Sequence, residues 1–279
     1  MKIVEIGSVL RAKLADLPRP IVLVPTMGAL HEGHRALIRR ARELAGEEGT
    51  VVVSIFVNPI QFDRASDLEG YPRPMDADVA ACEAEGVDMI FAPDVASMYY
   101  PDRSVTVSEA SLSQTLCGAT RPGHFDGVCT VVLKLFLLSG CDVAVFGEKD
   151  FQQLAIIRRM VRDLDVPVEI VGCPTVREPD GLAMSSRNVR LTEKQRDDAP
   201  RIRRALLAAS SAASADEILV SARREIEASP LARIDYLSLV DAVNLQPVDS
   251  LERPSVLATA VFYGNVRLID HVGITARVR

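Results

Sequence analysis

Two histidines, His31 and His34, stand three residues apart in the segment PTMGALHEGH, which covers residues 25–34. A short apolar run, 21–24, precedes this segment, and a helical pattern over 33–45 follows it. We expect a junction between a buried strand and a helix N-terminus to offer an anion free backbone N–H groups and the positive end of the helix dipole. Gly28 and Gly33 would let a ligand approach the backbone closely. The segment therefore indicates a phosphate-binding loop.

The two imidazoles have more than one possible role. Three residues apart at a helix start, they can lie on one side and donate hydrogen bonds to phosphate oxygens. Purely structural roles are also open, in which His31 caps the turn and His34 is a surface residue. A metal site is disfavoured, because Glu32 is the one carboxylate near them at ligand spacing and a helix would point it elsewhere.

Two later sets of polar residues could bind the same anion. Lys149 lies in Gly147–Asp150, directly after a buried run, and parallel strands would bring it to the sheet edge that carries the histidines. A lysine there would neutralise triphosphate charge, although it could also be a solvated helix-start residue. Ser185, Ser186 and Arg187 supply two hydroxyls and a guanidinium in a polar stretch, a string that is common when taken alone.

The elements that must position these residues alternate along the chain. Apolar runs predict strands, and amphipathic patterns between them predict helices, so the sequence predicts an α/β fold: a Rossmann-like, doubly wound parallel sheet. The expected strands are 21–24, 50–57, 87–91, 142–146 and 167–171, and the expected helices are 33–45, 76–85, 126–138 and 150–165.

The pattern changes after residue 174. Residues 192–229 resemble two charged amphipathic helices interrupted near Pro200, and short strands are expected at 234–240, 255–261 and 266–269. We therefore expect a nucleotide- and substrate-binding domain over 1–174. A smaller C-terminal α+β domain over 175–279 would act as a lid.

Composition narrows the class of protein. The chain has 279 residues, 48% hydrophobic and 25% charged, as in an ordinary globular protein. No apolar stretch is long and uncharged enough for a signal or a membrane span. The five cysteines form no CxxC pair, which favours free core thiols in a reducing compartment. The net charge of −6 disfavours a nucleic-acid partner, so we expect a cytoplasmic protein that binds small molecules.

Motifs along nearly the whole chain resemble the pantothenate synthetase (pantoate–β-alanine ligase) family of the HxGH nucleotidylyltransferase superfamily. Each string is modestly specific, and their common order makes coincidence improbable. They are PTMGALHEGH (25–34), FVNPIQF (56–62), YPR (71–73), RPGHFDGV (121–128), FGEKDFQQL (146–154), REPDGLAMSSRN (177–188), DYLSLVD (235–241) and RLID (267–270).

The resemblance implies a two-step reaction. Pantoate attacks the α-phosphorus of ATP to give pantoyl-adenylate and pyrophosphate, and β-alanine then displaces AMP to give pantothenate. It also implies a homodimer. We expect Mg²⁺ to be carried mainly by ATP, with acidic help at most from residues such as Asp76 or Asp78.

The resemblance also implies roles for particular residues. The family's phosphate contacts match His31, His34, Lys149, Ser185, Ser186 and Arg187, which we take as the catalytic set. Further ATP contacts are expected from Thr26, Met27, Gly28, Gly33, Gly147, Asp150 and Met184. Pantoate-binding amides match Asn58, Gln61 and Gln153, and an apolar wall around the dimethyl end of pantoate matches Met27, Phe56, Val128, Val131 and Val132.

This chemistry needs no protein nucleophile, because a carboxylate is already ionised at neutral pH. The enzyme has to align the carboxylate with the phosphorus and stabilise the charge that develops on phosphate. The sequence departs from the commonest family pattern in the loop 63–70 and at Val266 and His271, where threonine and asparagine are more usual. These departures bear on the lid rather than on phosphate contacts.

Three alternatives can be weighed against this assignment. A nucleotidylyltransferase acting on a phosphate ester would be expected to have Arg or Lys in place of Gln61 and Gln153. A silent nucleotide-binding regulator would be expected to lose at least one phosphate donor. A fragment of a class I aminoacyl-tRNA synthetase is disfavoured by the acidic charge and by the lack of an anticodon-binding segment.

Overall fold

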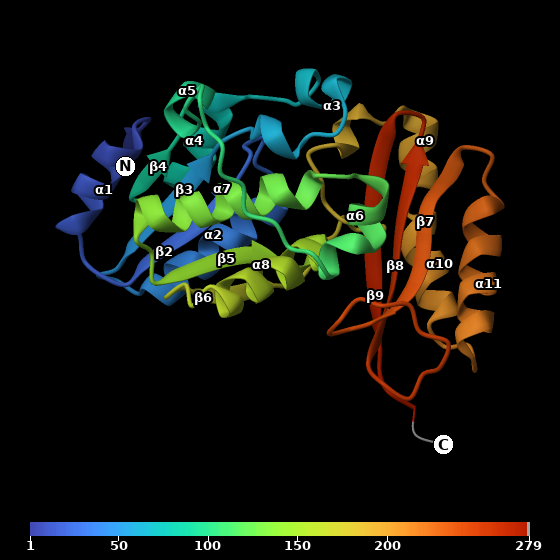
Figure 1. The fold of residues 1–279 in the computed structure, drawn as a ribbon. Coiled ribbons are helices and arrows are strands. Elements are labelled where there is room, and N and C mark those ends of the chain that lie inside the picture. The colour runs from blue at the N-terminus through green and yellow to red at the C-terminus, as the bar shows by residue number, and fades with distance from the viewer. Residues whose placement is uncertain (278–279) are drawn as a thin grey trace. The chain divides into compact units, whose positions relative to one another are not determined.

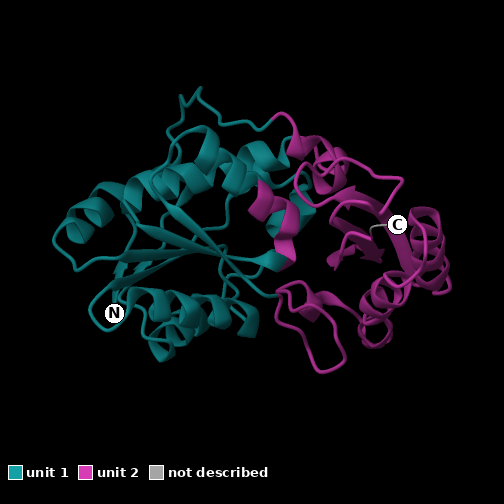
Figure 2. Ribbon diagram, turned by 90° about the horizontal axis from the view of Figure 1, so that it is seen from below, with its two compact units in different colours: residues 1–109, 123–148, 156–174 teal, residues 110–122, 149–155, 175–279 magenta. Residues whose placement is uncertain are grey.

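The structure, a computed structural model, describes residues 1–277 (Figure 1). The chain divides into two compact units (Figure 2): unit 1 comprises residues 1–109, 123–148 and 156–174, and unit 2 comprises 110–122, 149–155 and 175–279. The last change of unit falls between residues 174 and 175, where we placed the domain boundary. Two short segments that we had assigned to the first domain, 110–122 and 149–155, group with unit 2.

Unit 1 is built on a six-stranded sheet in which every pairing is parallel, as the sequence predicted. The strand order is β1-β4-β3-β2-β5-β6. All six residues of β3 are buried, because helices lie on both sides of the sheet (Figure 2). The strands are β1 (Lys2–Val4), β2 (Ile21–Thr26), β3 (Thr50–Ile55), β4 (Met89–Phe91), β5 (Val143–Gly147) and β6 (Glu169–Cys173).

Helices α2 and α8 are amphipathic, and α7 is largely buried. Helix α2 packs Leu37, Ile38 and Ala41 against the valines of β2 and β3, while α7 packs against α1 and β2. The helices are α1 (Gly7–Ala15), α2 (Glu32–Ala45), α3 (Ala65–Glu69), α4 (Met75–Ala84), α5 (Val95–Met98), α7 (His124–Ser139) and α8 (Phe151–Asp163), with 3-10 turns η1 (Pro59–Gln61) and η3 (Glu148–Asp150).

The sheet reverses its winding direction next to β2. The chain leaves β2 for β3 and β4 on one side, and it reaches β5 and β6 on the other side only later (Figure 1). The adjacent strands β2 and β5 run parallel, so their carboxyl ends, at Thr26 and Gly147, lie at the same edge. Open α/β sheets bind ligands at such a switch point.

Unit 2 contains a three-stranded antiparallel sheet, β7-β8-β9, with helices packed against it. Its core joins Ile202, Leu206 and Ile218 to Leu257 and Tyr263. The strands are β7 (Ala232–Asp241), β8 (Ser255–Tyr263) and β9 (Val266–Ile274). The helices are α6 (Leu116–Thr120), α9 (Glu193–Asp198), α10 (Arg201–Ala209) and α11 (Ala215–Glu227), with 3-10 turns η2 (Leu112–Gln114) and η4 (Asn188–Arg190).

Side-chain hydrogen bonds explain why the two short segments group with unit 2. The Gln152 side chain donates to the carbonyls of Leu112 and Thr115, at 2.8 and 2.7 Å, and accepts from the Cys117 N–H at 2.9 Å. Arg267 of β9 donates to Thr120 Oγ1 at 3.2 Å. These contacts join residues up to 147 positions apart in the chain, so no local pattern could have predicted them.

Several elements differ from the sequence prediction. We did not predict β1 and α1, because β1 has three residues and α1 shows little separation of polar and apolar faces. The two helices expected over 192–229 are three, since a second interruption follows Ala209 at Ser210–Ser214. Within the described residues, no helix is long and apolar enough to cross a bilayer.

Candidate active site

The histidine pair lies at the end of the β2–α2 loop and in the first turn of α2. His31 is the N-cap of α2, and its Nδ1 accepts a hydrogen bond from the Gly33 N–H at 3.1 Å. The His34 Nδ1 accepts one from the His31 N–H at 3.3 Å, which completes a capping box. The two ring centroids are 4.1 Å apart. His31 therefore caps the helix start, which was one of the two roles that the sequence left open for it.

The capping bonds also fix the state of both rings. A nitrogen that accepts from a backbone N–H carries no proton, so each imidazole has its proton on Nε2 and is neutral in this arrangement. Each Nε2–H is consequently a hydrogen-bond donor directed away from the capping bond. Capping and donation to phosphate are thus compatible roles of His31 and His34 rather than alternatives.

The expectation of free backbone N–H groups in this loop is wrong for most of its residues. The Gly28 N–H donates to Thr26 Oγ1 at 3.2 Å, and the N–H groups of Ala29 and Leu30 donate to the carboxylate of Asp78 at 2.9 and 2.7 Å. The His34 N–H donates to the His31 carbonyl at 2.8 Å. These N–H groups are held by bonds within the chain, so an anion at this loop would have to be bound largely by side-chain donors.

Three residues predicted to contact pantoate are joined by hydrogen bonds in unit 1. Gln61 Nε2 lies 3.2 Å from Met27 Sδ, and Asn58 Nδ2 donates to Gln61 Oε1 at 2.9 Å. Asn58 is 1% exposed. It also donates to the Gly127 carbonyl at 3.1 Å and accepts from the Tyr99 hydroxyl at 2.8 Å. The carboxamide of Asn58 therefore orients Gln61, whereas Gln61 is half-buried and better placed for a ligand.

Tyr99 was not among the residues that we predicted. It is buried, its ring centroid lies 6.0 Å from that of Phe56, and burial raises the pKa of its hydroxyl to about 12. The hydroxyl therefore stays protonated as the donor to Asn58. The segment SMYYPD that contains Tyr99 carries no signal of this role, because the contact joins positions 41 residues apart.

Helix α7 supplies the apolar residues next to this cluster. Val128, Val131 and Val132 are buried in unit 1, at 2%, 7% and 4% exposure. At the start of α7, His124 Nδ1 lies 2.7 Å from the Gln61 carbonyl. Methyl groups and an oriented amide suit a ligand with an apolar end and a polar end.

The remaining predicted side chains belong to unit 2. Lys149 Nζ lies 3.8 Å from the carboxylate of Asp150, in the turn η3 that opens α8. Gln153 is half-buried, while its neighbour Gln152 is buried and holds segment 112–117. Of the two adjacent glutamines, Gln152 therefore has a structural role and Gln153 is the more accessible one. Successive residues point about 100° apart on a helix, which separates the two.

The segment 184–188 is held in place by a network within unit 2. The Ser185 hydroxyl accepts from the Arg187 N–H at 3.2 Å. Asn188 donates to Glu178 at 3.0 Å and to the Ala183 carbonyl at 3.1 Å. Arg196 binds Glu178 at 2.8 Å. These bonds fix the backbone of the turn that carries Ser185, Ser186 and Arg187.

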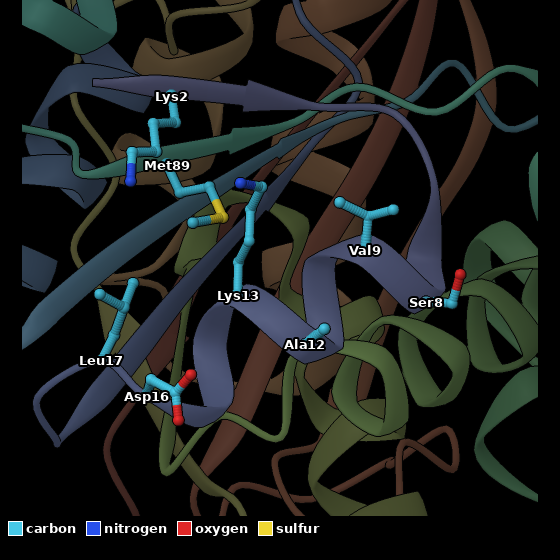
Figure 3. A pocket seen from close by; sticks show the side chains of 8 residues that line it. All are labelled: Lys2, Ser8, Val9, Ala12, Lys13, Asp16, Leu17 and Met89. Atoms are coloured by element: carbon cyan, nitrogen blue, oxygen red, sulfur yellow. The ribbon is translucent and has the colours of Figure 1, made fainter.

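A separate cavity of about 560 Å³ lies in unit 1 beside α1 and the edge of the sheet (Figure 3). None of the predicted site residues lines it. Its lining residues are Lys2, Ser8, Val9, Ala12, Lys13, Asp16, Leu17 and Met89. Across the described part of the chain, no group of three or more His, Cys, Asp or Glu side chains could hold a metal ion.

Comparisons with known proteins give a consistent result. A model of the family described as pantoate-beta-alanine ligase matches residues 2–273. A pantothenate synthetase from Akkermansia muciniphila is 56% identical over 256 residues, which is 90% of this chain and 91% of the relative. One from Solidesulfovibrio magneticus is 50% identical over 280 residues, covering 97% of each.

Solved structures agree in fold. A pantothenate synthetase from Thermus thermophilus superposes with a TM-score of 0.91 at 45% identity, covering 98% of this chain and 99% of the other. A pantoate-beta-alanine ligase from Francisella tularensis, complexed with beta-gamma ATP and beta-alanine, gives 0.81 at 32% identity, covering 98% and 97%.

Proposed function

The chain belongs to the pantoate–β-alanine ligase family, and from this membership we propose that it condenses pantoate with β-alanine to give pantothenate. ATP drives the reaction, and AMP and pyrophosphate are released. The observation that best separates this function from its rivals is the oriented amide of Gln61, bonded to Met27 and Asn58. A pocket for a phosphate ester would need a cation at that place.

The reaction proceeds in two displacements. A carboxylate oxygen of pantoate attacks the α-phosphorus of ATP, the bond to the bridging oxygen breaks, and pyrophosphate leaves with the electron pair. The amine of β-alanine then attacks the acyl carbon of pantoyl-adenylate, AMP leaves, and the nitrogen loses a proton. The protein's task in the first step is to align the carboxylate and stabilise the charge that develops on phosphate.

ATP would be bound by side-chain donors. His31 and His34 donate through Nε2–H, while Lys149 and Arg187 supply charge and Ser185 and Ser186 supply hydroxyls. Thr26, Met27, Gly28, Gly33, Gly147, Asp150 and Met184 would line the nucleotide. The bonded capping box supports the imidazole role, because it fixes the tautomer before ATP arrives.

Pantoate would be oriented by the amides of Gln61 and Gln153, with Asn58 holding Gln61 in place. Phe56, Met27 and the buried valines Val128, Val131 and Val132 would enclose its methyl groups. Neutral amides fit an acid that has to react, because they orient the carboxylate without lowering its ground-state energy as a cation would.

Other features of the proposal follow from the family. Mg²⁺ would enter mainly on the phosphates of ATP. There it would neutralise phosphate charge. We also propose that unit 2 acts as a lid that shields the adenylate from water, that the enzyme is a homodimer, and that it works in the cytoplasm.

Single-turnover kinetics test the proposal. With β-alanine omitted, enzyme mixed with ATP should release pyrophosphate only when pantoate is present. Lys149→Ala and His34→Ala should each slow this release about 10²- to 10³-fold, as expected for the loss of one donor to transition-state charge.

Lys194→Ala is the matched control, because Lys194 is an exposed lysine of α9. It should release pyrophosphate at the normal rate. Release with a different acid but not with pantoate would reassign the substrate, and a normal rate in Lys149→Ala would contradict the ATP assignment.

A further inference from the structure

The β2–α2 loop has a conformation that its own residues do not favour. Two successive residues lie in the left-handed region, Gly28 with φ of 79° and Ala29 with φ of 51°. Glycine adopts such angles readily, but a residue with a Cβ atom seldom does. Contacts elsewhere in the chain must therefore hold Ala29 in this conformation.

Those contacts come from a single carboxylate on another helix. Asp78 lies in the first turn of α4 and is 2% exposed. Its Oδ2 accepts from the Ala29 N–H at 2.9 Å, and its Oδ1 accepts from the Leu30 N–H at 2.7 Å. Both oxygens are used by consecutive backbone groups 48 and 49 residues away in sequence, and the second of these groups immediately precedes His31.

Close packing adds to these bonds. A Cβ atom at Gly28 would lie 2.8 Å from Asp78 Oδ2 and 3.0 Å from Ile55 Cγ2, which is nearer than side chains normally approach. The absence of a side chain at Gly28 is thus required by the carboxylate of Asp78 as well as by the backbone angle. Asp78 contacts three successive residues of the loop, Gly28, Ala29 and Leu30.

We propose that Asp78 is a positioning residue for ATP binding: its carboxylate fixes the β2–α2 loop so that His31 and His34 present their Nε2–H groups to phosphate. This inference rests on the proposed function and extends it to a residue that contacts the loop and not the nucleotide. It also means that the N–H groups of Ala29 and Leu30 bind Asp78 rather than phosphate.

A carboxylate suits this role better than any neutral side chain. Two oxygens on one carbon can accept from two adjacent N–H groups, whereas an asparagine offers one oxygen and turns an NH₂ group toward the second donor. Bonds to a charged acceptor are also stronger than bonds between neutral groups. Burial raises the pKa of Asp78, and the bonds from Leu30 and Ala29 oppose that change.

Asp78→Asn tests the proposal. We expect the dissociation constant of a non-hydrolysable ATP analogue, measured by calorimetry, and the KM for ATP to rise about tenfold or more. The KM for pantoate should stay within about twofold. A residue that only stabilised the fold would lower the amount of active enzyme, which reduces kcat and leaves both KM values unchanged.

Glu83→Gln is the matched control, since Glu83 is an exposed acid of the same helix and the change removes the same charge. It should leave both KM values unchanged. If Glu83→Gln weakened ATP binding as much as Asp78→Asn, general electrostatics would explain the effect and positioning would be refuted.

A double-mutant cycle gives a second readout. Gly28→Ala should weaken ATP binding through the clash with Asp78 and through its backbone angle. In Asp78→Ala the clash is gone, so adding Gly28→Ala should cost less than it does in the wild type. Additive effects would show that the two sites act independently and would overturn the proposed packing.

The outcomes separate this inference from the function on which it depends. If the unaltered enzyme releases no pyrophosphate with pantoate, the proposed function fails. If the unaltered enzyme is active and Asp78→Asn binds the ATP analogue with wild-type affinity, the proposed function stands and the positioning role of Asp78 is wrong.

Discussion

At the scale of single residues, the two nitrogens of each ring of His31 and His34 have different hydrogen-bonding states. Each Nδ1 accepts a backbone N–H of the helix start, and this leaves the proton on Nε2. The sequence placed both histidines at a helix N-terminus but left capping and phosphate binding as alternatives. The tertiary contacts make the two roles compatible in one ring, because the tautomer depends on hydrogen-bond partners that the sequence does not give.

Substitution of His31 should separate the two roles. In His31→Asn the side-chain oxygen can still cap α2, so the free energy of unfolding should stay near the wild-type value while pantoate-dependent pyrophosphate release falls at least tenfold. In His31→Ala, pyrophosphate release should fall in the same way, and the free energy of unfolding should also fall by about 1 kcal/mol because the cap is lost. Urea denaturation and stopped-flow assays measure the two effects, and an active His31→Asn enzyme would show that Nε2–H is dispensable.

At the scale of elements, α7 and the turn η1 approach each other at Gly127. A Cβ atom there would lie 2.5 Å from the Ile60 carbonyl oxygen and 2.7 Å from both Gln61 N and Gln61 Cα. The helix therefore packs on the backbone that carries Gln61, and Asn58 adds a bond to the Gly127 carbonyl. The sequence predicted α7 as a helix, but this near contact depends on residues far apart in the chain.

Gly127→Ala should accordingly displace η1. We expect a KM for pantoate raised several-fold and a loss of roughly 1–3 kcal/mol of stability from overpacking, with the KM for ATP changed less. Gly273→Ala is the comparison, because a Cβ atom there would meet no atom within 4 Å. Steady-state kinetics and thermal unfolding of both variants give the answer, and an unaltered KM for pantoate in Gly127→Ala would contradict the packing argument.

At the scale of the whole molecule, the five cysteines are free and buried, as the sequence predicted. Burial raises the pKa of Cys82 and Cys129 from 9.0 to about 12 and that of Cys141 to about 11. Folding therefore holds protons on these thiols that the unfolded chain would release above about pH 9. The stability they contribute is fully present below pH 9 and is lost as the pH rises toward 11–12.

Unfolding at alkaline pH tests whether the stability falls as the pH rises. The free energy of unfolding should be nearly flat from about pH 7 to 8.5 and should fall above about pH 9, by about 1 kcal/mol per pH unit for each affected thiol. Urea titrations between about pH 8 and 10.5 measure the slope, and Cys141→Ala should reduce it. A slope that is zero over this range would show that the thiols ionise equally in both states.

What the sequence determined by itself is what neighbouring residues encode. Alternating apolar runs and amphipathic patterns predicted the parallel α/β sheet, the later α+β part and the helix start that carries His31 and His34. Only the tertiary structure decided which groups hold that loop, Asn58 and the segment 112–117. Asp78, Tyr99 and Gln152, respectively, bind these partners from 35 to 49 residues away. Local periodicity reports the conformation of a segment, whereas contacts between distant segments depend on how the whole chain packs.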